Sequence, residues 1–458
     1  MVGTVRRSLL AAAVLSGTLV VEAAGQQTRA RIAAAVDSIV ESALKDKRAA
    51  GASVAVVRGR DTLAFKGYGQ ADLEWQVPTD VRAVYEIGSV TKQFTAAALL
   101  QLQEQGKLSL EDELTKYLPN YPTQGHKVTL RRLLDHTSGI KGYTEMPVFG
   151  SLMMRKLPRD SLVALFSAEP FDFAPGAAQV YNNSAYFLLG LVIEQVSGQS
   201  YGDYVKQHLF DRAGMSSSRY CSESAVIERR ANGYDFRPTG LQRAAYLDHT
   251  WPYAAGSLCS TVGDLVAWNR ALHGGRILSG SSYRELIGPG TLNDGTRLRY
   301  AKGLSVDSAF GRPLIAHGGG INGFLSQLDY YPEDSLSIVV LINTGGPVSP
   351  GAIARDIAEV FYGKWSPRGV AFTRDAADYA GEYRGVGRGR ELVARVTAST
   401  EGSGLSIQTG NAPARPLVHL GNELFALGNS RFTFVRENGK IVKLRADLGS
   451  VYSILQRK

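Results

Sequence analysis

The chain has 458 residues, of which 44% are hydrophobic and 20% are charged, a balance that excludes a disordered or fibrous protein and allows more than one domain. The formal net charge is +9, but the basic residues form no dense run, so the sequence does not predict nucleic-acid binding. Residues 370–458 hold 13 basic and 8 acidic side chains, and the C-terminal end is therefore the most basic part.

The first 25 residues have the order of a secretory signal peptide. Arg6 and Arg7 precede the uncharged run Leu9–Val21, and small residues follow at 23–25. A run of this length is too short to cross the roughly 30 Å hydrocarbon core as a helix, although a short anchor or a buried helix is the alternative interpretation. We expect export to the periplasm or the medium, loss of residues 1–25, and no membrane-spanning helix.

The first elements after this segment are a helix and a hairpin. Arg31–Lys45 has apolar residues near a 3.6-residue period, which predicts an amphipathic helix. Ala52–Val57 and Thr62–Lys66 flank a glycine-containing turn and predict two paired strands. Thr91–Gln105 is rich in helix formers, and helical patterns dominate from there to about residue 275, including Asn183–Val196.

Strand-like sequence returns at Leu314–His317, Phe324–Tyr331 and Ser337–Asn343, and a helix is expected at Gly351–Phe361. The predicted fold is therefore α+β: an antiparallel sheet built from both ends of residues 26–366, flanked by helices, with a helical subdomain inserted. After a linker at 364–369, short alternating segments such as Arg431–Val435 predict a small all-β domain over 370–458, a barrel or a sandwich.

Cys221 and Cys259 are the two cysteines of the chain. An even pair in an exported protein favours a disulfide, with two free thiols as the alternative.

Serine followed three residues later by lysine places a nucleophile and a base on one helix face. The pattern occurs three times, at Ser42/Lys45, Ser89/Lys92 and Ser138/Lys141. Ser42 lies inside the amphipathic helix, and Ser138 lies in the glycine-flanked run HTSGIKG, which is more typical of a loop. Ser89 instead follows an apolar segment and opens a helix, whose first turn presents unpaired N–H groups. On this motif alone, a helix-capping serine is an equal alternative.

Two further motifs carry suitable chemistry. Tyr181-Asn182-Asn183 supplies a phenol that can pass protons and an amide that can both donate and accept, although a loop tyrosine with a capping asparagine would look the same. His317-Gly318-Gly319-Gly320 follows a strand, and its glycines would let a substrate lie against the backbone. His273-Gly274-Gly275 is better interpreted as a helix C-cap.

Ser89-x-x-Lys92, Tyr181-x-Asn183 and His317-x-Gly319 reproduce, in order and at similar spacing, the three motifs of the penicillin-recognising serine hydrolases. The chain resembles the branch that holds class C β-lactamases, DD-peptidases, D-aminopeptidases and related esterases. LLDHTSGI at 133–140, AGSLCSTVGDL at 255–265 and HGGGINGF at 317–324 are similar too, over roughly residues 30–363. The tail, with YAGEY at 379–383, looks like the β-rich domain often appended to such hydrolases.

The resemblance implies an acyl-enzyme mechanism without a cofactor, on small-molecule or peptide substrates with an amide or ester bond. Ser89 would attack the carbonyl, and Lys92 and Tyr181 would handle the proton. The substrate would be held by Asn183, His317, Gly319 and Gly320. Many β-lactamases have lysine where this chain has His317, which argues for peptidase or esterase activity over strong β-lactamase activity. The alternative is a catalytically silent penicillin-binding-type protein that binds peptidoglycan or a protein partner.

The remaining motifs do not predict a cofactor, metal or catalytic site. Gly318–Gly323 satisfies G-x-G-x-x-G, but the sequence after it is strand-like, so a dinucleotide loop is not expected. The seven histidines show no ligand spacing, and no metal site is predicted. Asp135–Gly139 (DHTSG) is interpreted as a structural turn.

Overall fold

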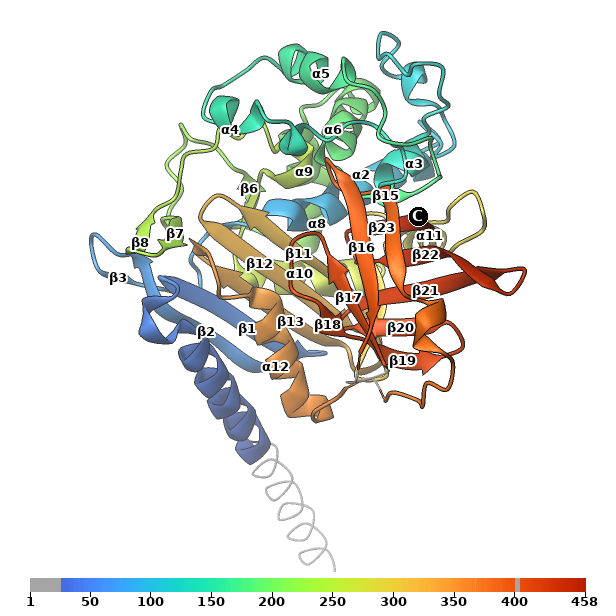
Figure 1. The fold of residues 1–458 in the computed structure, drawn as a ribbon. Coiled ribbons are helices and arrows are strands. Elements are labelled where there is room, and N and C mark those ends of the chain that lie inside the picture. The colour runs from blue at the N-terminus through green and yellow to red at the C-terminus, as the bar shows by residue number, and fades with distance from the viewer. Residues whose placement is uncertain (1–25, 367, 400–403) are drawn as a thin grey trace, which may run out of the picture.

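The computed structural model describes residues 26–366, 368–399 and 404–458. The expected signal peptide, residues 1–25, lies outside this range. The described chain forms an α+β part and a C-terminal β part that packs beside it (Figure 1). None of the described helices combines the length and the apolar character needed to cross a membrane.

A seven-stranded antiparallel sheet forms the centre of the α+β part, in the order β10-β11-β12-β13-β1-β2-β3. Its strands are β1 (Gly51–Arg58), β2 (Asp61–Asp72), β3 (Val77–Pro78), β10 (Ser305–Ala309), β11 (Arg312–Ile321), β12 (Phe324–Tyr331) and β13 (Leu336–Ile342). The pairing of β1 with β13, with Val54 opposite Val340, joins the two ends of the domain. The predicted assembly of one sheet from both ends is thus confirmed.

Helices cover both faces of this sheet, which explains why β1 is apolar at nearly every position. Val54 and Val56 pack with the N-terminal helix, residues 26–44, and with α12 (Pro350–Tyr362). Ala55 and Val57 point to the opposite face and join a larger core. Because successive side chains of a strand alternate between faces, both sets must be apolar when neither face is solvated.

The chain between β3 and β10 is mainly helical, as predicted. Its helices are α2 (Thr91–Glu104), α3 (Leu130–Leu134), α4 (Phe149–Leu152), α5 (Arg159–Ser167), α6 (Asn183–Ser197), α7 (Tyr201–Val205), α8 (Asp211–Ala213), α9 (Tyr253–Gly256), α10 (Val262–His273) and α11 (Gly280–Ile287). Two small sheets accompany them: β4 (Tyr85–Glu86) with β9 (Leu258–Ser260) and β6 (Arg219–Tyr220), and β14 (Thr344–Gly345) with β7 (Tyr234–Arg237) and β8 (Gly240–Arg243). α2 and α6 pack together in the core shared with the sheet.

Nine strands of the C-terminal part form one antiparallel sheet in the order β18-β17-β16-β15-β23-β22-β21-β20-β19. They are β15 (Gly381–Val386), β16 (Glu391–Ala398), β17 (Leu405–Thr409), β18 (Arg415–Pro416), β19 (Val418–Gly421), β20 (Leu424–Leu427), β21 (Ser430–Glu437), β22 (Lys440–Asp447) and β23 (Val451–Arg457). The two end strands are consecutive in the chain, so the sheet curls into a barrel-like shape around its own apolar core. The all-β expectation is confirmed.

A short strand from the α+β part, β5 (Gln179–Val180), adds to this barrel beside β23. The segment directly before Tyr181 is therefore paired with the C-terminal part rather than with its own domain.

Candidate active site

Ser89 lies in a single 3₁₀ turn, Gly88–Val90, immediately before α2. Gly88 has φ +49°, and a Cβ built on it would lie 2.8 Å from the Gly320 nitrogen. The turn therefore depends on glycine both for its left-handed backbone and for close contact with β11. The helix start behind it directs a positive dipole end toward Ser89.

Lys92 lies one turn into α2 and is fully buried. Its Nζ contacts Ser89 Oγ at 3.2 Å, Asn183 Oδ1 at 2.8 Å and the Ala255 carbonyl oxygen at 2.9 Å. Burial lowers the pKa of Lys92 well below 10.5, and the positive charge of Arg388 lowers it further. A neutral amine donates to the two amide oxygens and keeps its lone pair for the Ser89 hydroxyl proton.

The Tyr181 ring lies against this amine, with Lys92 Nζ 4.6 Å from the ring centroid. Its Oη is buried and has no complete hydrogen bond among the described residues, although the Ser89 hydroxyl is close enough to act on its ionisation. Burial raises the pKa of Tyr181 above its ordinary value of 10.0, so the phenol keeps its proton at neutral pH. Ser89 therefore lies between an amine whose pKa is lowered and a phenol whose pKa is raised.

The two asparagines after Tyr181 divide two duties. Asn182 caps α6 by accepting from the Ala185 backbone N–H at 2.9 Å. Asn183 instead accepts from Lys92 through Oδ1 and donates to Thr144 Oγ1 at 3.2 Å. The helix-capping role that Asn183 could have had belongs to its neighbour.

His317 is buried on β11 and faces the same site. Its Nδ1 lies 2.6 Å from the Gly318 carbonyl oxygen and must carry the proton there, so Nε2 accepts from the Tyr300 hydroxyl at 3.0 Å. Burial, reinforced by the nearby Lys92, lowers the pKa of His317 to about 4. His317 is therefore neutral at pH 7 and offers no permanent charge.

The strand does not end at His317, as the sequence suggested, but continues through the three glycines to Ile321. Pairing with β12 supplies the reason, since Gly319 lies opposite Ser326. A Cβ on Gly319 would lie 2.1 Å from the Ile87 carbonyl oxygen, which keeps the strand tight against the Ser89 turn. At Gly320 the nearest heavy atom would be 3.5 Å away.

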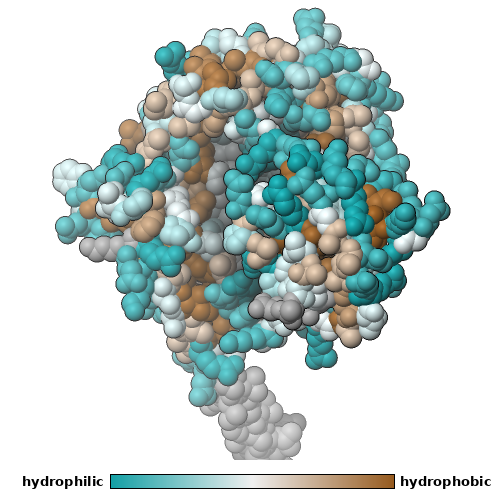
Figure 2. Space-filling model, in the orientation of Figure 1, coloured by the Kyte–Doolittle hydropathy of each residue, from teal (hydrophilic) through white to brown (hydrophobic). Residues whose placement is uncertain are grey.

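Ser89 opens into two hollows. The larger, of about 640 Å³, is bordered by Tyr181, β11 and the start of α12, and by the C-terminal part. The smaller, of about 220 Å³, is lined by aromatic side chains that include Tyr143, Phe149 and Trp251. Figure 2 shows a hollow between the sheet and the C-terminal part, with hydrophilic side chains along the rim of the latter.

The other candidate positions lack such surroundings. Ser42 is exposed on the N-terminal helix, and Lys141 is ion-paired with Asp172 at 2.8 Å. His273 ends α10 and stacks on Tyr330.

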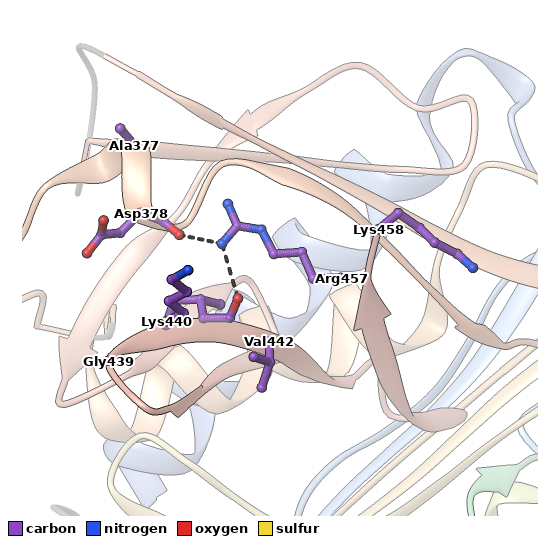
Figure 3. Close-up of a pocket in the computed structure, with 8 residues that line it drawn as sticks. Ala377, Asp378, Gly439, Lys440, Val442, Arg457 and Lys458 are labelled. Atoms are coloured by element: carbon purple, nitrogen blue, oxygen red, sulfur yellow. Dashed lines mark hydrogen bonds between the residues drawn. The ribbon is translucent and has the colours of Figure 1, made fainter.

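A third hollow, of about 470 Å³, lies in the C-terminal part (Figure 3). Arg457 donates there to the carbonyl oxygens of residues 378 and 441. The described residues that line this hollow include no serine, cysteine or histidine.

The sequence matches the family model described as Beta-lactamase over residues 36–361, more than half of the chain and all of the sheet and helical subdomain. The chain belongs to the β-lactamase family. The resemblance drawn from the three motifs is thereby confirmed, together with the fold that it implied.

The curated proteins that this chain resembles include a penicillin-binding protein and a D-aminopeptidase. The chain is 29% identical over 317 residues to "Penicillin-binding protein 4*" of Bacillus subtilis (strain 168), covering 66% of this chain and 69% of the relative. It is 28% identical over 321 residues to a D-aminopeptidase of Brucella anthropi, covering 69% of this chain and 60% of that protein.

Solved structures extend the likeness. A D-stereospecific amidohydrolase from Streptomyces sp. superposes with a TM-score of 0.62 at 29% identity, covering 73% of this chain and 99% of that one. An octameric penicillin-binding protein homologue from Pyrococcus abyssi gives a TM-score of 0.64 at 25% identity and covers 92% of this chain and 99% of its own. The second match therefore extends into the C-terminal part.

In this β-lactamase-family chain the C-terminal part contributes residues that the motifs did not reveal. Arg388, at the tip of the β15–β16 hairpin, and Ser450, just before β23, both line the larger hollow. Arg388 Cζ lies 5.4 Å from the centroid of the Tyr181 ring. The basic composition of residues 370–458 was the one signal in the sequence that could have pointed to Arg388.

The DHTSG segment holds the Tyr181 strand from behind. His136 Nδ1 accepts from the Asn182 backbone N–H at 3.1 Å, and the His136 carbonyl accepts from the Val180 N–H at 3.0 Å. The imidazole packs against the Tyr181 ring with centroids 4.4 Å apart. Burial lowers the pKa of His136 well below 6.5, so the imidazole that packs against Tyr181 is neutral. These contacts favour the structural interpretation of this motif.

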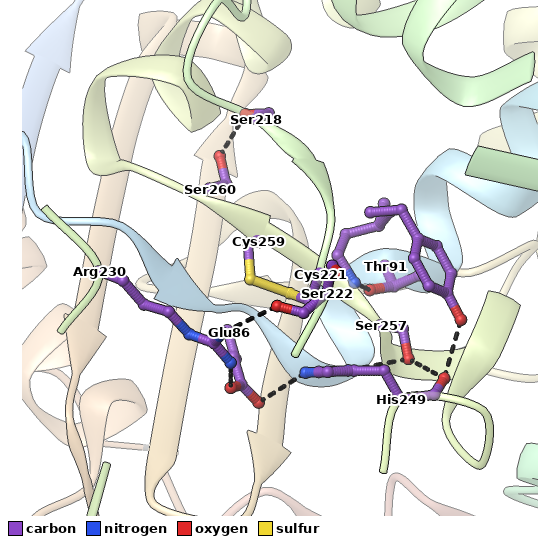
Figure 4. Close-up of a disulfide and its surroundings, with 12 residues drawn as sticks. Glu86, Thr91, Ser218, Cys221, Ser222, Arg230, His249, Ser257, Cys259 and Ser260 are labelled. Atoms are coloured by element: carbon purple, nitrogen blue, oxygen red, sulfur yellow. Dashed lines mark hydrogen bonds and ion pairs between the residues drawn. A yellow bond between two sulfur atoms is a disulfide. The ribbon is translucent and has the colours of Figure 1, made fainter. Parts of the chain in front are cut away.

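A disulfide joins Cys221 and Cys259 next to Glu86 (Figure 4). Cys259 lies opposite Glu86 in the β4–β9 pair, three residues before Ser89. Glu86 belongs to a cluster with Glu223, Arg230 and His249. Burial lowers the pKa of His249, but the two carboxylates outweigh it and raise it to about 9. The two carboxylates are thus balanced by two cations of the chain itself.

Proposed function

We propose that this chain is an exported serine hydrolase that cleaves amide or ester bonds through an acyl-enzyme on Ser89. The observation that carries the proposal is the contact between Lys92 and Ser89. Lys92 is buried, its amine donates to Asn183 Oδ1 and to the Ala255 carbonyl oxygen, and its pKa is lowered. A serine hydroxyl needs such a base to become a nucleophile.

In the proposed reaction, Ser89 Oγ attacks the substrate carbonyl while its proton passes to Lys92 Nζ. The backbone N–H groups of Ser89 and Gly320, on either side of the contact between the turn and β11, support the oxyanion. The tetrahedral intermediate then collapses, and the leaving nitrogen or oxygen takes its proton from the Lys92–Tyr181 pair. Water attacks the acyl ester, returns a proton to Ser89 and releases the acid.

Asn183 has a double duty in this scheme. Its Oδ1 holds Lys92, and its amide nitrogen has a second hydrogen beyond the one given to Thr144. Since Asn183 lines both hollows beside Ser89, this hydrogen can bind an amide oxygen of the acyl part. Relatives named for peptidase and amidase activity support amide or ester substrates.

Export is supported by the sequence order of residues 1–25 and by the Cys221–Cys259 disulfide, since disulfides persist in oxidising compartments. Fractionation of cells that express the full chain, with mass analysis of the mature N-terminus, tests this. Accumulation of an uncleaved chain in the cytosol would contradict it.

A fluorophosphonate probe followed by peptide mapping tests the mechanism. Label is expected on Ser89 and is lost in Ser89→Ala, along with all turnover, while the melting temperature stays unchanged. Ser42→Ala is the matched control, because Ser42 also precedes a lysine by three residues but is exposed on the N-terminal helix. Hydrolysis that persists in Ser89→Ala ends the proposed mechanism; a chain without label at any pH is the silent binding protein instead.

A further inference from the structure

The tip of the β15–β16 hairpin is docked into the proposed active site. Arg388 Nε donates to Glu145 Oε1, and Nη2 lies 3.4 Å from Thr144 Oγ1. Gly389 has φ +66°, and a Cβ on it would lie 2.6 Å from the Glu145 Cβ. The tip therefore fits against the 143–145 segment only with glycine beside the arginine, and this fit fixes where the guanidinium lies.

Arg388 is the one charged side chain among the described residues that line either hollow beside Ser89. The other titratable groups there are Tyr143, Tyr181 and His317, and all three are neutral at pH 7 because burial raises the pKa of the two phenols and lowers that of the imidazole. The one cationic side chain that lines the cleft thus comes from the C-terminal part, and Glu145 offsets part of its charge through the ion pair.

The Arg388 guanidinium has N–H donors that Glu145 and Thr144 do not use and that can bind a ligand. Its contacts with Glu145 and Thr144 account for two of its five N–H donors. The side chain is 39% exposed, against 14% for Glu145, so the cation rather than its partner faces the cleft. A planar guanidinium with free N–H groups is suited to bind a carboxylate through two parallel hydrogen bonds.

We propose that Arg388 is the substrate's carboxylate anchor: it selects peptides or esters that carry a free carboxylate close to the bond cleaved by Ser89. It supplies, from the appended barrel, the permanent cation that neutral His317 lacks. Glu145 positions the guanidinium while leaving its outer N–H groups to the ligand. This inference rests on the proposed function of Ser89.

The test uses two substrates with the same scissile ester, one ending in a free carboxylate and one in the matched methylamide. The selectivity is the ratio of their kcat/KM values, measured at the optimal pH of each variant and at high salt. The ratio cancels changes in the basicity of Lys92, on which Arg388 also acts, and high salt suppresses long-range steering.

The intact protein is expected to prefer the carboxylate at least tenfold, and Arg388→Gln should lower that ratio by about 10- to 100-fold, mainly through KM. Arg388→Lys should restore part of it. Arg390→Gln, which removes a charge from the same hairpin but lines a different hollow, is the control and should keep the ratio.

An unchanged ratio in Arg388→Gln overturns the inference, and so does an equal fall in Arg390→Gln, which would indicate general attraction. Either result with Ser89 still labelled by the fluorophosphonate leaves the proposed hydrolase in place. Absence of label on Ser89 rejects the hydrolase and this inference together.

Discussion

The backbone N–H of Tyr181 donates to the carbonyl oxygen of Ser450 at 2.8 Å, across 269 positions of sequence. This bond continues the β5–β23 pairing, in which Val180 lies opposite Val451. The proposed acid of the site is thus held by the C-terminal part, which behaves as a component of the active site rather than as an independent appendage.

The turn that carries Ser450 is anchored by Asp447, which takes two hydrogen bonds from Arg299, at 2.6 and 2.9 Å, and one from the Gly449 N–H. Asp447→Ala should lower the free energy of unfolding by about 1–3 kcal/mol, because the largely buried Arg299 loses one of its two carboxylate partners and keeps only Asp307. It should also lower kcat by about 10- to 100-fold as Tyr181 shifts. Urea unfolding and steady-state kinetics measure the two effects.

Glu437→Gln is the control for that variant, since the Glu437–Lys443 pair is exposed and distant from the cleft; its loss should cost less than about 1 kcal/mol. A wild-type kcat in a folded Asp447→Ala protein would show that the barrel does not position Tyr181.

The rate should depend on pH through Lys92. Its amine accepts the serine proton only when neutral, so kcat/KM on an uncharged ester should rise with pH through the pKa of Lys92, which lies well below 10.5. The raised pKa of Tyr181 keeps the phenol protonated across the plateau, and His317, with a pKa of about 4, adds no step near neutrality.

Lys92→Arg leaves a permanent cation in place and should lower kcat by about 10³-fold or more at every pH. A pH profile unchanged by this substitution would mean that another group takes the serine proton.

Two adjacent glycines should respond differently to alanine. Gly319→Ala places a methyl group 2.1 Å from the Ile87 carbonyl oxygen and 2.3 Å from Ser326 Oγ, both fixed in the core, and should cost about 3 kcal/mol of stability or prevent folding. Gly320→Ala meets nothing closer than 3.5 Å and should melt within a few degrees of the wild type. Equal melting temperatures would contradict the close approach of β11 to the Ser89 turn.

The Cys221–Cys259 disulfide closes a loop of 38 residues and should contribute about 4 kcal/mol to stability. Urea unfolding with and without dithiothreitol measures this, and Cys221→Ala with Cys259→Ala should lose the response to reductant. Two reactive thiols in the denatured, unreduced protein would rule the bridge out.

Local pattern was sufficient for much of the fold. Phe324–Tyr331 was predicted with the bounds that β12 has, and the predicted limits of α2, α6 and α12 differ by one residue at most at either end. The sequence predicts that the strand ends at His317, because the three glycines that follow have low strand propensity. In the structure β11 continues to Ile321 because these glycines pair with β12.

By itself, the sequence determined the order of sheet and helical segments and the three motifs around Ser89, because periodicity and i,i+3 spacing act over a few residues. Tertiary structure alone decided that Lys92 is buried with a lowered pKa and that Arg388 and Ser450 line the hollow beside Ser89. The pKa of an amine depends on how completely packing removes water, and contacts across hundreds of positions depend on how two domains dock. Neither the pKa nor the long-range contacts can be derived from a local sequence pattern.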